Sequence, residues 1–195
     1  VRGDRVEGTI ADLTIGYRVP EPILVVANRL LAHTGVDATE SRSVRRVGEA
    51  PSWLRVEGGR LAAAVADLAV ATKQRRRISA IVAPADLHDA IANALVQRGL
   101  VAVDHVHELD DGEIPLFGAE AVKGLEFDGV IVVNPHQILS ESPAAPTEQV
   151  VSEHVVTEHV VTERGARLLY VAMTRAVQEL HFVSDADPPP VLDVV

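Results

Sequence analysis

Residues 168–183 read LLYVAMTRAVQELHFV, and this stretch carries two hydrophobic patterns in succession. Residues 166–176 are patterned as a helix, and residues 179–183 as a strand. A helix followed at once by a strand is a repeating unit of α/β folds. A single arginine, Arg175, interrupts the apolar run, and its permanent charge is costly to hold near a core without a negative partner. Arg175 is therefore a packing accident, a partner for a carboxylate or a ligand for phosphate.

The same alternation of helices and strands extends along most of the chain. Residues 129–133 (GVIVV) are apolar on both faces, as in the central strand of a parallel sheet. Outward from this strand, the hydrophobic spacing predicts three helices and two strands. The helices are expected at 20–34, 59–74 and 86–98, and the strands at 78–83 and 100–106. We therefore expect an α/β fold with a parallel sheet flanked by helices.

Two segments do not follow this pattern. Residues 139–164 begin rich in Ser, Pro and Ala and continue into a tandem pentad, VVSEHVVTEHVVTER. With a period of five, the valine pairs cannot all lie on one face of a helix or of a strand. We therefore predict a flexible insertion. His154 and His159 lie five apart rather than four, so a metal site there is not favoured. We expect a single domain over 1–195, with a core at about 10–184 and an extended tail at 185–195.

Composition narrows the classes of protein that the chain can belong to. It has 195 residues, 47% of them hydrophobic, and no cysteine. Disorder throughout is excluded, as are a disulfide framework and a thiolate metal site. The sequence shows no signal-peptide pattern and no apolar run long enough to span a membrane. We expect a cytoplasmic protein that does not contact membranes and is a piece of something larger.

Charge is spread unevenly along the chain. Residues 1–77 carry 13 Lys/Arg and 9 Asp/Glu, whereas residues 78–195 carry 5 and 19, and the net charge is −10. Tight binding of nucleic acid needs clustered cations, so this balance is unfavourable for it. The cluster Arg75-Arg76-Arg77 is interpreted as a solvated helix end that complements the helix dipole.

Three short segments contain residues suited to chemistry. These are Tyr17-Arg18 before the first helix, VKGLEFDGVIVVNP at 122–135, and the surroundings of Arg175. A glycine lets backbone approach a ligand closely, and a glutamate beside it can accept hydrogen bonds from a ribose hydroxyl. Each segment alone is a weak signal, because such turns and surface arginines are common.

Together and in order, the three segments resemble a known family. YRVPEPILVVANRLL (17–31), VKGLEFDGVIVV (122–133) and RLLYVAMTRAVQEL (167–180) resemble motifs IV, V and VI of the superfamily 1 helicases of the UvrD/Rep/PcrA type. The resemblance spans nearly the whole chain. It implies the second RecA-like domain (2A) of such a motor, a parallel α/β domain that faces a first domain across an ATP-binding cleft.

The resemblance also implies roles for individual residues. Arg18 and Arg175 match the arginines that reach the γ-phosphate of ATP, Glu126 matches the acid that meets the ribose, and Gly124 is the glycine beside it. Lys123 would face nucleotide or nucleic acid. Arginine's planar fork suits both phosphate recognition and the charge that develops in phosphoryl transfer. The implied cofactors are ATP and Mg²⁺.

Several family features are missing from the sequence. It contains no GxxxxGK[ST] motif, so the phosphate cradle and the magnesium ligands would come from an N-terminal RecA-like domain, and we expect this fragment alone to be inactive. There is no room for a 2B insertion between Arg18 and Lys123. Glu120 occupies the position where DNA-translocating members usually carry histidine, and a carboxylate would repel a phosphodiester backbone.

These departures most resemble the HelD branch, helicase-like ATPases that act on RNA polymerase. The partners implied are the N-terminal domain and RNA polymerase. A DNA helicase or translocase of the UvrD type, with DNA as partner, is the first alternative. A non-catalytic interaction domain is the second, although three nucleotide-facing groups would have no use in a bare scaffold.

Overall fold

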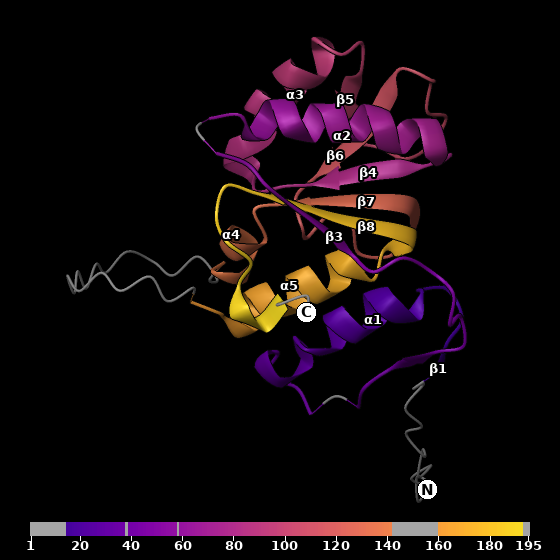
Figure 1. Cartoon of the computed structure of the whole chain (residues 1–195), viewed down its shortest axis with the longest axis vertical. Coiled ribbons are helices and arrows are strands. Elements are labelled where there is room, and N and C mark those ends of the chain that lie inside the picture. The colour runs from indigo at the N-terminus through magenta and orange to yellow at the C-terminus, as the bar shows by residue number, and fades with distance from the viewer. Residues whose placement is uncertain (1–14, 38, 58, 142–159, 193–195) are drawn as a thin grey trace, which may run out of the picture.

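A six-stranded parallel sheet forms the centre of the molecule. The structure is a computed structural model that describes residues 15–37, 39–57, 59–141 and 160–192 (Figure 1). The strand order is β3-β8-β7-β4-β6-β5, and every neighbouring pair is parallel. The strands are β3 (Ser52–Arg55), β4 (Ser79–Val82), β5 (Val101–Val103), β6 (Glu113–Phe117), β7 (Phe127–Val133) and β8 (Ala176–Ser184). The predicted α/β fold with a parallel sheet is confirmed.

Helices cover both faces of this sheet, which gives three layers (Figure 1). One face packs against α2 (Leu61–Arg75) and α3 (His88–Val96), and the other against α1 (Glu21–Asn28), α4 (Pro135–Leu139) and α5 (Glu163–Met173). A separate two-stranded parallel pair, β1 (Ile15–Gly16) with β2 (Arg42–Ser43), lies beside α1.

The central strands are buried on both faces, as their continuous apolar sequence predicts. In β7, Val130 and Val132 belong to the core on the α1/α5 side, whereas Ile131 and Val133 belong to the core on the α2/α3 side. All four side chains are fully buried. Successive side chains of a strand point to opposite faces, so β7 joins the two hydrophobic layers.

Some element boundaries differ from the prediction. The helix expected to run to Thr34 ends at Asn28, and a short 3₁₀ helix (Leu31–His33) follows it. Hydrogen bonds from Leu30 N to Ala27 O (3.0 Å) and from His33 N to Leu30 O (2.9 Å) span three residues, which tightens the chain beyond α-helical geometry. Strands β3 and β6 and helix α4 were not predicted.

Both ends of the predicted insertion at 139–164 belong to helices. Leu139 closes α4, and Glu163 and Arg164 open α5. The hydroxyl of Thr162 caps α5 by accepting from Gly165 N at 2.9 Å, and Thr162 N donates to Leu139 O at 2.9 Å. These bonds bring the two ends of the segment together. Most of the pentad repeat, with His154 and His159, lies outside the described residues.

The tail predicted to be extended is partly packed. Residues Pro190–Leu192 form a 3₁₀ turn, and Leu192 is fully buried in the core on the α1/α5 side. Burying one leucine side chain contributes roughly 1.5–3 kcal/mol, which is enough to hold a short terminal turn against the domain. The prediction of an extended end is therefore wrong for these residues.

Within the described residues, no helix has the length and apolar character needed to cross a membrane.

Candidate functional site

Two of the predicted site residues stand at the start of neighbouring strands. Glu126 immediately precedes β7 and Arg175 immediately precedes β8. Because β7 and β8 are adjacent and parallel (Figure 1), their amino ends meet at one edge of the sheet. A hydrogen bond of 3.0 Å from Phe127 N to Arg175 O fixes the two segments side by side. The topology of the sheet thus brings together residues 49 positions apart in sequence.

Arg18 reaches the same place from the segment between β1 and α1. Arg18, Glu126 and Arg175 line one groove of about 300 Å³, together with Tyr170 and Thr174 of the α5 end. Three separated segments therefore present two cations and one acid to a shared opening, as the resemblance implied.

Arg18 and Glu126 form an ion pair across the groove. Their side chains are 74% and 42% exposed. An exposed pair of this kind contributes at most about 1 kcal/mol, so a ligand with its own charge or hydroxyl groups can displace it at little cost. The pair keeps both side chains at the groove and leaves each of them able to bind a ligand instead.

Arg175 is half-buried, and its partners are neutral oxygens. Its Nε donates to Val171 O at 3.2 Å, its Nη1 to Leu125 O at 3.2 Å and its Nη2 to Thr174 Oγ1 at 3.4 Å. Val171 lies in the last turn of α5, where carbonyl groups carry the negative end of the helix dipole. No carboxylate is ion-paired to Arg175 in the described part of the chain. Its guanidinium is held in place by neutral acceptors and has no carboxylate partner among the described residues.

Gly124 and Lys123 lie in the turn before β7 but do not line the groove. Gly124 has a φ of 85°, in the left-handed region that favours glycine, and there is open space where a Cβ would stand. This turn places Leu125 O where it accepts a hydrogen bond from Arg175. It also places Glu126 at the groove. Lys123 is exposed. Contact of either residue with a nucleotide stays a prediction.

Arg45 is a residue of this region that the sequence analysis missed. Its Nη1 donates to Arg18 O at 2.8 Å and to Val177 O at 2.7 Å, so it joins the Arg18 segment to β8. Nothing in the sequence distinguishes Arg45 from its neighbour Arg46, since its role depends on the tertiary position of both carbonyls.

Glu120 forms an ion pair with Arg164, at the start of α5. The carboxylate is 60% exposed, and the guanidinium 39%. The prediction treated Glu120 as an uncompensated negative charge that repels a phosphodiester backbone. Since Arg164 neutralises that charge, this part of the argument against nucleic acid loses its force.

The basic cluster at the end of α2 is more than a solvated helix end. Arg75 Nη2 and Arg76 Nη2 lie 3.4 Å and 3.2 Å from the two carboxylate oxygens of Glu179, whose side chain is only 5% exposed. Buried carboxylates require such partners. Two of the three arginines therefore pair with a buried carboxylate. This corrects the interpretation of the cluster as a solvated helix end.

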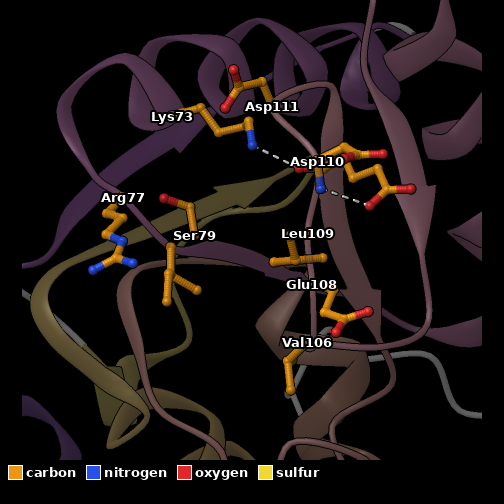
Figure 2. Close-up of a pocket in the computed structure, with 10 residues that line it drawn as sticks. Lys73, Arg77, Ser79, Val106, Glu108, Leu109, Asp110 and Asp111 are labelled. Carbon is orange, nitrogen blue, oxygen red and sulfur yellow. Dashed lines mark hydrogen bonds between the residues drawn. The ribbon is translucent and has the colours of Figure 1, made fainter.

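A second hollow, of about 360 Å³, lies at the amino end of β4 (Figure 2). Lys73 and Arg77 line it together with Glu108, Asp110 and Asp111. Lys73 Nζ donates to the backbone oxygen of Glu113 at 2.7 Å, and Asp110 N donates to Glu113 Oε2 at 3.0 Å. Charges of both signs are mixed here, so the hollow lacks the concentrated cations of a phosphate site.

No group of three or more His, Asp or Glu side chains in the described ranges is arranged to hold a metal ion. This geometry defines a class of protein: a parallel α/β domain that presents two arginines and an acid at one edge of its sheet.

Comparison with known proteins identifies the family. Residues 60–186, more than half of the chain, match the UvrD-like helicase C-terminal domain. The chain belongs to this family. The matched range includes Glu126 and Arg175, whereas Arg18 and Arg45 precede it.

One solved structure supports the fold over a longer range. It is the crystal structure of the C-terminal domain of a possible DNA helicase from Lactobacillus plantarum WCFS1. The two chains are 23% identical, the match covers 90% of this chain and 91% of that one, and the TM-score is 0.61. The fold is therefore that of a helicase C-terminal RecA-like domain. No curated protein matches the chain.

Proposed function

We propose that the chain is the C-terminal RecA-like domain of an ATP-dependent superfamily 1 motor, with residues 1–195 forming one domain. The observation that carries the proposal is the convergence of Arg18, Glu126 and Arg175 on one groove. The donor set suits ATP, since guanidinium groups bind phosphate oxygens and a carboxylate accepts from ribose hydroxyls. An N-terminal RecA-like domain supplies the phosphate cradle and the Mg²⁺ ligands.

Arg175 stabilises the charge that develops on the γ-phosphate during transfer. Its three hydrogen bonds to neutral oxygens set the direction of the guanidinium beforehand, so little reorganisation is needed when negative charge appears. Bound Mg²⁺ neutralises phosphate charge and orients the phosphate chain.

Arg18 and Glu126 exchange partners when ATP binds. Arg18 turns from Glu126 to phosphate, and Glu126 becomes free to accept from the ribose. Tyr17, which is 70% exposed beside Arg18, offers an aromatic face on which a nucleobase can stack. Closure of the two domains around ATP, and their separation after hydrolysis, provides the mechanical step.

Substitution of Arg175 tests this proposal in the full-length protein. Arg175→Ala lowers kcat by about a thousandfold or more, as expected for an arginine that stabilises transferring phosphate, while ATP binding changes far less. Steady-state turnover and binding of a fluorescent ATP analogue separate the two effects. Arg167→Ala, on the exposed side of α5, is the control and keeps wild-type turnover. Unchanged turnover in Arg175→Ala removes the arginine from the mechanism.

We further propose that the motor acts on RNA polymerase in the cytoplasm, as members of the HelD branch do. Three features support this target: a net charge of −10, the resemblance of the motif phrases, and the compact course of the chain between Arg18 and Lys123. The described residues there form only elements of the RecA-like fold and leave no space for a 2B domain.

DNA is the alternative target. The Arg164–Glu120 pair favours it, because the neutralised carboxylate no longer opposes a phosphodiester backbone. ATPase assays of the full-length protein with core RNA polymerase or with single-stranded DNA distinguish the two targets. Stimulation by DNA that weakens steeply with salt identifies a DNA translocase. Stimulation by polymerase, together with its capture from cell extract, identifies the polymerase motor.

A further inference from the structure

The segment that carries Arg18 lies outside the six-stranded sheet and joins the main body of the fold through Val19 and α1, which pack against the core. Its strand β1 pairs with β2 in a two-stranded sheet that is separate from the six-stranded one. The Arg18 side chain is largely exposed, and its ion pair with Glu126 is weak and exchangeable. Direct contacts of the Arg18 backbone add to this packing and set where it lies relative to Arg175.

The guanidinium of Arg45 provides such a contact. One nitrogen, Nη1, donates to Arg18 O at 2.8 Å and to Val177 O at 2.7 Å. Val177 stands two residues after Arg175 in β8. A single charged donor therefore bridges the backbones of the two segments that carry the arginines of the proposed ATP site.

Residues next to Arg45 also form hydrogen bonds with the stretch of chain around Arg18. Val44 N donates to Gly16 O at 3.1 Å, and Ser43 Oγ donates to Val19 O at 2.6 Å. The backbone oxygen of Arg45 accepts from Glu21 N, at the first turn of α1, at 2.9 Å. Residues 43–45 are thus hydrogen-bonded to residues 16–21, between β1 and α1. Among them, Arg45 also contacts β8.

We propose that Arg45 is a positioning residue for the ATP site, which sets the distance between Arg18 and Arg175 through the backbones of both. This inference rests on the proposed function. Hydrogen bonds from a charged donor to a carbonyl are stronger than neutral ones, so the bridge is well suited to fixing geometry. Arg45 does not touch ATP; it acts through Arg18.

Side-chain replacement in the full-length protein tests the role. Arg45→Met keeps the aliphatic stem and removes the donors, and kcat falls by about tenfold to a hundredfold, because a displacement near 1 Å at a reacting centre has effects of this size. The KM for ATP changes much less. Arg45→Lys retains a charged donor and recovers most of the turnover. Arg46→Met, the same change at the neighbouring exposed arginine, leaves kcat unchanged.

The double variant Arg18→Met/Arg45→Met separates positioning from general stability. If Arg45 acts through Arg18, the double variant turns over no more slowly than Arg18→Met alone. Wild-type turnover in Arg45→Met, alongside a large loss in Arg18→Met, overturns the inference and leaves the proposed function intact. Equal losses in Arg45→Met and Arg45→Lys, with matching decreases in the urea midpoint, also overturn it. Wild-type turnover in Arg18→Met contradicts the proposed function itself.

Discussion

Arg18 and Glu126 contact each other in this structure, although the resemblance assigns them to different parts of one nucleotide. In the proposed function, the ion pair keeps a cation at the groove of a chain whose net charge is −10. While it is paired with Glu126, Arg18 does not form ion pairs with acids elsewhere among the residues that the structure describes. Paired Glu126 in turn repels approaching phosphates less. The same two residues can then separate to bind phosphate and ribose.

Replacing Glu126 by glutamine tests the ribose contact in the full-length protein. A hydrogen bond to a charged acceptor contributes about 1.5–3 kcal/mol, so its loss lowers discrimination against a ribose lacking the hydroxyl by about tenfold or more. The measurement is the ratio of kcat/KM for ATP to that for 2′-deoxyATP and 3′-deoxyATP. Glu57→Gln, an exposed acid away from the groove, is the control and keeps the wild-type ratios. Identical ratios in Glu126→Gln contradict the assignment.

At the scale of elements, the contact between α4 and α5 depends on a glycine. A Cβ on Gly165 would lie 2.5 Å from Ile138 O and closer still to Leu139 O, both of them backbone atoms that cannot rotate away. Alanine usually favours a helix over glycine by about 1 kcal/mol. Overpacking costs about 1–3 kcal/mol or more, so the collision outweighs the gain in helix propensity.

We therefore expect Gly165→Ala to lower the free energy of unfolding of the chain by about 1–3 kcal/mol. Urea denaturation followed by circular dichroism measures the change. Gly118→Ala is the matched control, because no atom lies within 4 Å of its added Cβ and its φ is not in the left-handed region. If Gly165→Ala is as stable as Gly118→Ala, α4 and α5 do not approach as closely as described.

Helix α2 and the turn that follows α3 are joined at the surface by an ion pair between Asp67 and Arg98. Arg98 Nε donates to Asp67 Oδ1 at 2.9 Å, and this hydrogen bond lowers the pKa of Asp67 below its ordinary value of 3.8. A carboxyl whose folded pKa is lowered stabilises the fold above its unfolded pKa, and the contribution is lost as the pH falls through the folded pKa. Because both groups are exposed, the effect is small.

The expected result is a small decrease in the urea midpoint of Asp67→Asn at pH 7. The difference from the wild type shrinks as the pH is lowered from about 4 to below 3.8, where Asp67 itself becomes protonated. Parallel titrations of the two proteins measure it. Asp104→Asn, an exposed acid in the loop after β5, serves as the control. A difference that is constant with pH would mean that the Arg98 contact is not the cause.

Elements with a strong periodic or apolar pattern could be predicted from sequence, whereas the strands β3 and β6 could not. The residues of α2, α5, β4 and β7 carry that pattern because each is buried on one stripe or on both faces. Strand β3 is mostly exposed and four residues long, and β6 contains Pro115, which disfavours a strand assignment. Arg18, Glu126 and Arg175 were identified only because three motifs occur in order, and Arg45 belongs to none of the three.

At the scale of the whole molecule, the predicted site lies at the amino edge of β7 and β8, open to a partner domain. Neither Arg18 nor Arg175 is enclosed by the described residues, and in the proposed function the 300 Å³ groove forms one side of the nucleotide pocket. Under this proposal, binding energy for ATP depends on a second surface, and the two domains have to close for the arginines to reach phosphate.

Hydrogen exchange measures this closure directly. In the full-length protein, a non-hydrolysable ATP analogue with Mg²⁺ slows exchange in the segments 15–18 and 123–127, because closure excludes water from the groove edge. Exchange at β5, on the far edge of the sheet, stays the same and serves as the internal control. The 195-residue chain alone shows no such protection, since it offers half of the site. Protection in the isolated chain, or none in the full-length protein, contradicts a shared ATP site at this edge.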